Sequence, residues 1–338
     1  MTVTATRRVL LLAHTGREEA REIARSFAKS LTAHGIVVRL LVSEAAEIGL
    51  DAALFDPAIE TVTDDGAAAV DCEVAVVIGG DGTILRAAEI THGSGTPLLG
   101  VNLGHLGFLA EADPDDVEAT IEAIIARDYT TEERLTVDVT VYRDSELVAR
   151  TFALNEASVE KAARERMLEM VVEIDGRPLS RWGADGVVCA TPTGSTAYNF
   201  SAGGPIVWPV VEALLIVPLS AHALFARPMV VAPSSVIAIE VMATNEGAGV
   251  LWCDGRRTVD LPPGARIEVR RGAPVPLVRL HDSPFTDRLV AKFDLSVEGW
   301  RGAGERRLRN GGRSSGDAGS PDGPAAVTDA DQADGGES

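Results

Sequence analysis

The sequence predicts two domains: an N-terminal α/β domain with a doubly wound parallel sheet, and a C-terminal, mainly-β domain. Apolar runs alternate with helical patterns up to about Arg134, strict apolar–polar alternation begins at Leu135, and few helix signals follow. Strands that alternate with helices form parallel sheets covered on both faces, whereas short alternating strands form antiparallel sheets. A chain of 338 residues that is 46% hydrophobic can build two cores.

The N-terminal elements follow from hydrophobic periodicity. Val9–Leu12 is a short apolar run bounded by Thr15-Gly16, which is typical of a buried parallel strand. Apolar residues at helical spacing predict a helix over Glu18–Leu31, with Gly35 as its end. Further elements are expected in this order: a strand at 36–42, a strand at 74–78, a helix at 84–90 and a strand at 97–101.

Strand patterns dominate from Leu135 onward. Leu135–Val141 alternates as a half-exposed strand does, and Met170–Ile174 leads into the tight turn Asp175-Gly176 of a hairpin. Further strands of the β-rich domain are expected at 228–242, 249–260, 265–271 and 275–280. A helix at Phe285–Phe293 is expected to pack back on the first domain.

The expected domain bounds are 1–134 for the α/β domain, 135–282 for the β-rich domain and 283–300 for the segment that returns to the first domain. After Trp300 the chain is rich in Gly, Ser, Asp, Arg and Ala and has almost no large apolar residue. Such a segment buries too little surface to offset the entropy of ordering. Residues 301–338 are therefore predicted to be disordered.

Composition excludes several classes of function. A net charge of −19 argues against a nucleic-acid or anionic-membrane partner, because both require a basic surface. No segment approaches the roughly 20 apolar residues of a membrane span, and the N-terminal apolar run is too short for a signal peptide. The cysteines Cys72, Cys189 and Cys253 form no zinc-type spacing. A cytoplasmic protein with no metal site of its own is expected.

The strongest chemical signal is the run Gly79-Gly80-Asp81-Gly82-Thr83, which follows the apolar strand Val74–Ile78 and opens a helix. Glycines let the backbone approach a phosphate closely, and a helix N-terminus offers free N–H groups and a partial positive charge. Asp81 stands at the carboxyl end of a parallel strand, where open α/β sheets bind ligands. A carboxylate there can accept a proton from a hydroxyl nucleophile. The motif predicts phosphoryl transfer.

Three other interpretations of this motif are weaker. An ordinary strand-to-helix turn with Asp81 as helix cap uses the same residue types, but three glycines around one aspartate make that interpretation the weaker one. The loop is not a Walker A loop, because the chain contains no Gly-Lys pair. It is not a dinucleotide fingerprint either, because the Gly-x-Gly-x-x-Gly spacing is absent.

Two further segments carry polar side chains. Thr191–Ser201 follows an apolar strand with many hydroxyls and small residues, which suits a ligand more than a solvated turn. Within it, Tyr198 could stack on a base or ribose or be a half-buried core residue. Asn155-Glu156 could recognise a base edge or ribose hydroxyls, although taken alone a cap or turn is the better interpretation.

Together these segments resemble the bacterial, actinobacterial-type NAD kinases, which phosphorylate NAD to NADP. The resemblance rests on Gly79–Thr83, Asn155-Glu156 and Thr191–Ser201, and extends to Gly100–Leu109 and the region of His222–Pro228. It spans roughly residues 8–298. The Gly-Gly-Asp-Gly-Thr loop alone is shared with lipid kinases, but its combination with the Thr/Ser-rich segment is more specific.

The resemblance implies a role for each matching residue. Asp81 would be the base that takes the proton from the 2′-hydroxyl of the adenosine ribose, and Gly79, Gly80, Gly82 and Thr83 would form the phosphate loop. Gly82 and Arg86 would also contact the substrates, and Asp185 would contact the nicotinamide end. The remaining residues implied to bind NAD are Asn155, Glu156, Arg166, Thr196, Ala197, Tyr198, Asn199, Phe200 and Ser201. Arg256 stands in an Asp254-Gly255-Arg256 segment where the family usually has Gln, so that contact differs.

The resemblance also implies the substrates and the assembly. The donor would be ATP or inorganic polyphosphate with Mg²⁺ on its phosphates, and the chain would form a homodimer or homotetramer. A lipid or diacylglycerol kinase that shares the loop is the alternative, but it needs a greasy or basic membrane-facing entrance that this acidic chain does not offer clearly. A non-catalytic dinucleotide-binding regulator is a third alternative, against which the retained Asp81 argues.

Overall fold

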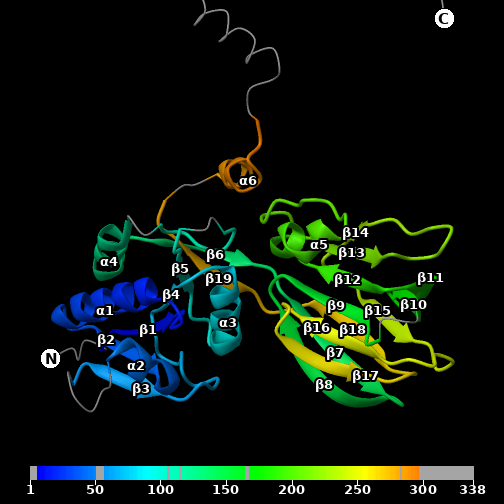
Figure 1. The fold of residues 1–338 in the computed structure, drawn as a ribbon, viewed down its shortest axis with the longest axis horizontal. Helices are drawn as coiled ribbons and strands as arrows, with labels where there is room; N and C mark the ends of the chain where they lie inside the picture. Colours follow the sequence, from blue (N-terminus) through cyan, green and yellow to red (C-terminus); the bar gives the residue numbers. More distant parts are fainter. Residues whose placement is uncertain are drawn as a thin grey trace, which may run out of the picture. The chain divides into compact units, whose positions relative to one another are not determined.

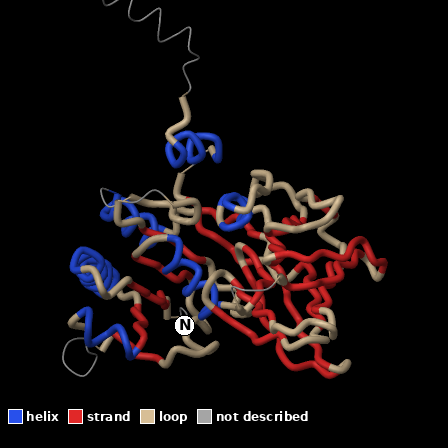
Figure 2. Tube along the Cα trace, turned by 45° about the vertical axis from the view of Figure 1, so that its right-hand side comes forward, coloured by secondary structure: helices blue, strands red, loops and turns tan. Residues whose placement is uncertain are grey.

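The computed structural model describes residues 6–50, 57–104, 107–113, 116–163, 167–281 and 284–296. Residues 1–292 form one compact unit, which holds all the site residues discussed below. Within it, an α/β domain precedes two antiparallel sheets. Figure 2 shows most helices around the sheet of the α/β domain, whereas the β-rich part consists mainly of strands and loops. The predicted fold class is confirmed.

The first sheet has the strand order β3-β2-β1-β4-β5-β19-β6 (Figure 1). Its strands β1 to β5 run parallel, as a doubly wound sheet requires. The strands are β1 (Arg8–Ala13), β2 (Val37–Leu41), β3 (Ile59–Val62), β4 (Val74–Ile78), β5 (Leu98–Val101), β6 (Thr130–Arg134) and β19 (Val275–Arg279). The helices are α1 (Glu18–Ala33), α2 (Val42–Ile48), α3 (Asp81–Thr91) and α4 (Val117–Ala126).

Alternation along the central strands explains why both sheet faces are covered. Val9 and Leu11 of β1 belong to a core that includes residues of α1, α2 and α4. Leu10 and Leu12, which point the other way, belong to a second core that includes residues of α3. A strand buried on both faces is continuously apolar, which is why Val9–Leu12 and Val74–Ile78 are short unbroken apolar runs.

The β-rich part consists of two six-stranded antiparallel sheets that share one core, which draws apolar residues from both. One sheet has the order β11-β10-β15-β18-β7-β8, and the other has the order β14-β13-β12-β9-β16-β17. The first comprises β7 (Val137–Arg143), β8 (Glu146–Ala153), β10 (Leu168–Ile174), β11 (Arg177–Ala184), β15 (Ile237–Val241) and β18 (Arg266–Arg271). The second comprises β9 (Glu156–Lys161), β12 (Gly186–Ala190), β13 (Leu214–Leu219), β14 (Met229–Val231), β16 (Gly249–Cys253) and β17 (Arg257–Leu261).

One strand lies in a different sheet from the one expected. The segment predicted as Val275–Leu280 of the β-rich domain forms β19, which pairs in parallel with β5 and antiparallel with β6. That prediction is wrong. A short strand with alternating apolar residues has the same sequence pattern in either sheet, and here the space between β5 and β6 determines its place.

Two expected long strands are each divided by a turn. The range 228–242 contains β14 and β15, and the range 249–260 is a hairpin of β16 and β17 with Asp254 and Gly255 at positive φ. Positive φ is what a tight hairpin turn requires.

The cysteines Cys72, Cys189 and Cys253 are buried and unpaired.

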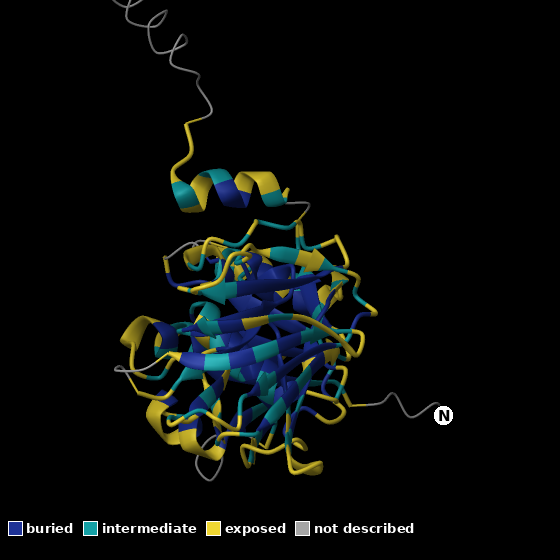
Figure 3. Cartoon of the chain, turned by 90° about the vertical axis from the view of Figure 1, so that its right-hand side faces the viewer, coloured by how far each residue is buried: buried dark blue, intermediate teal, exposed yellow. Residues whose placement is uncertain are grey.

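The last described element is the helix α6 (Phe285–Phe293). Four of its nine residues are exposed, and Arg288 and Leu289 are its buried residues (Figure 3). The predicted tail, residues 301–338, lies outside the described residues. Across the described ranges, no helix combines the length and the apolar character needed to cross a membrane.

Candidate active site

The loop between β4 and α3 adopts a conformation that requires glycine. Gly79 has a φ of 156°, which L side chains rarely adopt, and a Cβ there would collide with the side chain of Thr83. The N–H of Gly79 donates to the carbonyl of Val101 at 2.9 Å, which fixes the loop to β5. Helix α3 then begins at Asp81, three residues earlier than the periodicity predicted.

Asp81 is partly buried and its carboxylate is held by backbone groups. Oδ2 accepts the N–H of Phe108 at 3.1 Å, and Oδ1 accepts the N–H of Leu109 at 3.2 Å. A Cβ at Gly107 would collide with this carboxylate, so the segment approaches Asp81 closely only because residue 107 is glycine. We call residues 107–111 the strap. The strap fixes the direction in which the Asp81 carboxylate points.

A cavity of about 460 Å³ adjoins the loop at the carboxyl ends of β1, β4 and β5. Its lining includes Arg17, Arg86 and Arg256 and no acidic residue. Asp81 does not line the cavity, but its neighbours Gly80 and Gly82 do. We call this space the arginine-lined cavity. In a chain with a net charge of −19, three arginines without a lining carboxylate create a local site for an anion.

Arg86 reaches this cavity from α3 and is oriented by a buried carboxylate. Its guanidinium pairs with Glu44 of α2, whose side chain is 4% exposed and also accepts the N–H of Ala13 at 2.9 Å. A longer contact of 3.5 Å joins Arg86 to Asp64. Burial raises the pKa of Glu44, and its bonds to Ala13 and Arg86 oppose that rise.

Asn155 and Glu156 lie in a turn that is organised by Asp254. The Asp254 carboxylate accepts the N–H of Leu154 at 3.0 Å and the N–H of Asn155 at 2.7 Å, and it pairs with Arg257 at 2.8 Å. Glu156 is buried, and its Oε2 has no hydrogen-bond partner. Burial, and then the negative charge of Asp254, raise the pKa of Glu156 to about 8. A proton donor or a ribose hydroxyl would satisfy that oxygen.

The Thr/Ser-rich segment packs directly against this turn. The hydroxyl of Thr191 donates to the carbonyl of Leu154 at 2.6 Å, and a Cβ at Gly194 would collide with the backbone carbonyl of Asn155. The hydroxyl of Ser195 donates to the carbonyl of Val207 at 3.1 Å. Thr191 and Ser195 are fully buried, so their hydroxyls hold the segment together. The expectation that the hydroxyls of this patch serve a ligand does not hold for these two residues.

The residues implied to bind NAD in this segment divide into exposed and buried ones. Tyr198, Phe200 and Ser201 are exposed, and Thr196 and Ala197 are half-buried. Asn199 is buried, and its amide donates to the carbonyls of Ser195 and Pro205 at 3.2 and 3.1 Å. Asn199 thus holds the shape of the segment.

Tyr198 lies near a group of acidic residues. Its pKa is raised by partial burial first and then by the charges of Glu160, Glu156 and Asp185. The N–H of Tyr198 in turn contributes a hydrogen bond to Glu156. The aromatic ring is 38% exposed, which leaves a face for a planar ligand.

Asp185 stands at the opposite end of β12 from Thr191. It precedes Gly186, whereas Thr191 follows Ala190, and a strand of this length spans roughly 17 Å. Its carboxylate pairs with Lys161 at 2.5 Å, and that partner holds the pKa of Asp185 below its usual value. Asp185 thus lies at the far end of β12 from the turn at 154–156, and Tyr198 is close enough to both ends to be affected by the charges of Glu156 and Asp185.

The two domains meet around α3. Leu154, which precedes Asn155, shares a core with Ile84 and Leu85 of α3 and Leu109 of the strap. Arg256 and Arg257 also pair with Glu89 of α3, at 3.4 and 3.7 Å. The turn at 154–156 and the loop of Asp81 thus flank the same helix.

Several site residues were missed by sequence reasoning. Asp254, the strap, and residues 14–17 and 102–103 of the arginine-lined cavity carried no assignment. His14–Arg17 could have been found, because they follow a buried parallel strand at its carboxyl end. Arg166 lies outside the described residues. Over the described ranges no group of three or more His, Cys, Asp or Glu side chains could hold a metal ion.

Comparison with known proteins places the chain among NAD kinases. The family model "ATP-NAD kinase N-terminal domain" matches residues 9–129, and "ATP-NAD kinase C-terminal domain" matches residues 154–279. The NAD kinase of Thermobifida fusca is 60% identical over 309 residues, which cover 90% of this chain and 94% of the relative. The NAD kinase of Mycobacterium tuberculosis is 52% identical over 307 residues, which cover 89% and 100%.

Solved structures agree with this result. Yeast NADH kinase complexed with NADH matches with a TM-score of 0.78 at 27% identity, covering 88% of this chain and 90% of that chain. An NAD kinase from Archaeoglobus fulgidus in complex with ATP matches with a TM-score of 0.62 at 23% identity, covering 86% and 98%, which shows a shared fold. Nothing in these comparisons supports the lipid-kinase alternative.

Proposed function

The chain belongs to the NAD kinase family and phosphorylates NAD to NADP, and from this premise we propose that the transfer takes place beside Asp81. The arginine-lined cavity would hold the phosphates of the donor, and the turn at 154–156 with the segment 196–201 would hold NAD. The observation that carries the proposal is the position of Asp81 between Gly80 and Gly82, two lining residues of a cavity with three arginines and no carboxylate.

Asp81 would act as the general base. As the 2′-oxygen of the adenosine ribose bonds to the terminal phosphorus of the donor, its proton passes to a carboxylate oxygen of Asp81 and the bond to the leaving phosphate oxygen breaks. Positioning and charge neutralisation matter most in such transfers. The N–H groups of Phe108 and Leu109 hold the carboxylate in one orientation, which favours proton transfer along one direction.

ATP is the donor that the family description names, and inorganic polyphosphate is proposed as a second donor. Arg17, Arg86 and Arg256 offer planar forks that suit phosphate oxygens, and the free N–H groups at the start of α3 add a partial positive charge. Mg²⁺ on the donor would neutralise charge on its phosphates. The described residues form no cage for it, so the ion would be held by the donor and water.

NAD would be bound by the β-rich domain. Glu156 and Asn155 are proposed to bind the adenosine ribose, and Tyr198, Phe200 and Ser201 the adenine side, because these residues adjoin one another and the last three are exposed. The yeast NADH kinase was solved with NADH, a ligand of the same chemistry. Asp185 remains a proposed contact of the nicotinamide end, and Arg166 remains a proposed basic contact of NAD.

The remaining proposals concern assembly and location. We propose a homodimer or homotetramer. Asp185 lies at the far end of β12 from Thr191, and in such an assembly it could contact the nicotinamide end of an NAD molecule bound by a neighbouring subunit. We also propose a cytoplasmic location and dependence on a divalent cation. Light scattering tests the proposed assembly. An assay of NADP formation after removal of divalent metal tests the dependence on a cation.

An assay of NADP formation with separate variation of donor and NAD tests the assigned cavity. R256Q removes one arginine of the arginine-lined cavity, so the KM for ATP should rise about tenfold while the KM for NAD stays unchanged. R181Q, which alters an exposed arginine of β11 paired with Glu169, is the matched control and should change neither. A rise in the KM for NAD alone would contradict the proposal.

A further inference from the structure

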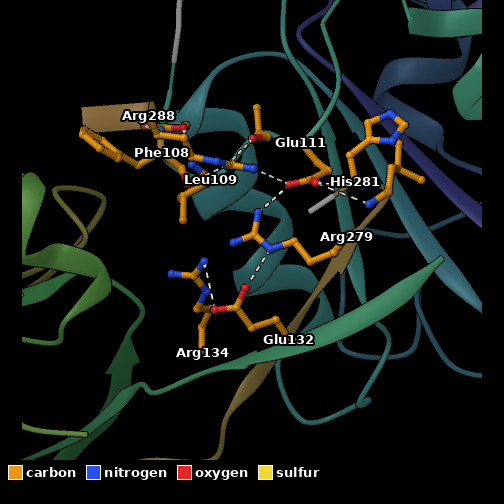
Figure 4. Close-up of polar contacts among 11 residues, drawn as sticks. Phe108, Leu109, Glu111, Glu132, Arg134, Arg279, His281 and Arg288 are labelled. Atoms are coloured by element: carbon orange, nitrogen blue, oxygen red, sulfur yellow. Dashed lines mark hydrogen bonds and ion pairs between the residues drawn. The ribbon is translucent and has the colours of Figure 1, made fainter. Parts of the chain in front are cut away.

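Arg288 of helix α6 makes several polar contacts with the strap. The side chain of Arg288 is 9% exposed; its Nη1 donates to the carbonyls of Phe108 and Ala110 at 3.4 and 2.8 Å, and its Nη2 pairs with Glu111 (Figure 4). A single guanidinium thus holds three residues of the strap, Phe108, Ala110 and Glu111. Its fork geometry makes this possible, because a planar group with five donors can bind several acceptors in fixed directions.

The same strap also holds Asp81. Phe108 donates its N–H to the carboxylate of Asp81 and receives a bond from Arg288 on its carbonyl. Leu109 supplies the second N–H to Asp81 and lies between the two carbonyls that Arg288 binds. The backbone of the strap is therefore fixed between the base on one side and Arg288 on the other.

Glu111 anchors the far end of the strap. Its side chain is 1% exposed, pairs with both Arg279 and Arg288, and accepts the N–H of Leu280 at 3.3 Å. Arg279 pairs further with Glu132 at 2.7 Å. A buried ion pair holds its geometry tightly, because a loss of either partner leaves an uncompensated charge away from water.

Two other residues of α6, Phe285 and Leu289, also pack against the rest of the chain. Leu289 is the other buried residue of the helix. Phe285 at its start lies 5.9 Å from the ring of Phe108 and 5.3 Å from that of Trp208, measured between ring centroids. The N–H of Glu111 also donates to the carbonyl of Gly100 in β5 at 2.9 Å. Arg288, the Glu111 carboxylate and this bond to β5 together set the position of the strap.

We propose that Arg288 is a positioning residue for phosphoryl transfer, acting through the strap on the direction of the Asp81 carboxylate. This inference rests on the proposed role of Asp81 as base. Loss of Arg288 would let the strap shift and change the direction of the two N–H groups that hold the carboxylate. Misplacement of a reacting group by about 1 Å can cost about 10²-fold in rate. Arg288 touches neither substrate in this account.

The chain offers a matched control in Arg7. Arg7 donates to two successive backbone carbonyls, Ile124 and Ile125, at 2.6 and 2.8 Å and pairs with Glu73, so it repeats the chemistry of Arg288. It precedes β1, at the amino ends of the parallel strands, whereas Asp81 follows β4 at the carboxyl ends. If each arginine only stabilises the fold, replacing Arg288 and replacing Arg7 should have similar effects.

The first experiment compares kcat and KM for R288Q, R288K and R7Q in the full chain, well below the melting temperature of each. R288Q should lower kcat about 10- to 100-fold and leave the KM for NAD and for ATP within about threefold. R288K, which keeps the charge and can reach one carbonyl, should recover part of the loss, and R7Q should change kcat less than about twofold. Equal losses in R288Q and R7Q, or a loss confined to KM, would overturn the inference.

A double-mutant cycle with D81N separates this inference from the proposed function. If Arg288 acts through Asp81, R288Q should lower the residual rate of D81N by less than about twofold. If the two losses instead multiply, Arg288 does not act through Asp81 and the inference is wrong. If D81N alone turns over like the wild type, the role of Asp81 fails, and the inference fails with it.

Discussion

At the scale of single residues, the site depends on how buried carboxylates are partnered. Asp254 is buried, and its carboxylate accepts two backbone N–H groups and pairs with Arg257, whereas Glu156 has an oxygen without a hydrogen-bond partner. The negative charge of Asp254 also disfavours ionisation of Glu156. This arrangement keeps Glu156 able to donate a hydrogen bond in the free enzyme near neutral pH.

The pH dependence of stability tests this description of Glu156. Its pKa is about 8 in the folded chain against 4.5 as the ordinary value, so between these limits the folded chain keeps a proton that the unfolded chain releases. The contribution of Glu156 to stability is then fully present below pH 4.5 and is lost as pH rises toward 8. E156Q lacks this titration, so between pH 5 and 8 it should gain on the order of 3 kcal/mol relative to wild type. Urea unfolding of both proteins without NAD measures this, and parallel pH curves would refute it.

At the scale of elements, the NAD side of the site is a contact between two loops. The segment 191–207 is held by its own hydroxyls and by Asn199, and it lies against the turn at 154–156. The outer face of β12, with Val188 and Ala190, packs under this segment in a small separate core. The exposed side chains of Tyr198, Phe200 and Ser201 are therefore presented by a rigid base.

A glycine pair tests the contact between these loops. G194A would place a methyl group against the backbone of Asn155, so it should destabilise the chain by about 2–3 kcal/mol and raise the KM for NAD. G247A is the matched control, because a Cβ there meets no atom within 4 Å, and it should leave both quantities near wild type. Thermal unfolding and steady-state kinetics measure the two effects. Equal behaviour of the two variants would show that the loops are not packed as described.

The elements that sequence reasoning found are those with local signals. A few neighbouring residues are enough to predict the strand at Val9–Leu12, the helix from Glu18 and the loop at Gly79–Thr83. Helix α2 was missed because it follows β2 without an intervening turn, so its first residue looked like the end of the strand. The strap was missed as a partner of Asp81 because it binds the carboxylate through backbone N–H groups that lie 27 and 28 residues further along the chain. Backbone groups are the same in every residue, so the pattern of side chains does not reveal such a contact.

At the scale of the whole molecule, the chain leaves the first sheet after β6 and returns to it as β19. β19 lies between β5 and β6, and Val275 and Leu277 join the core that contains residues of α3 and the strap. Sequence periodicity could not assign this strand, since its neighbours in the sheet lie more than 140 residues earlier. The α/β domain is therefore completed only after the β-rich domain has been made.

This topology predicts how the parts fold. A fragment of residues 1–134 lacks β19, leaves β6 without its hydrogen-bonded neighbour and exposes the edge of β5. It should show no cooperative thermal transition by circular dichroism, whereas the full chain should unfold in one transition. A fragment that melts cooperatively, at a temperature close to that of the full chain, would contradict the dependence on β19.

The most direct test of Asp81 as the general base is the turnover of D81N in NADP formation from NAD and ATP. The kcat of D81N should fall about 10²- to 10⁴-fold, while the melting temperature and the dissociation constant for NAD stay close to those of the wild type. A D81N enzyme that turns over at the wild-type rate would contradict the claim that this carboxylate takes the proton from the ribose hydroxyl.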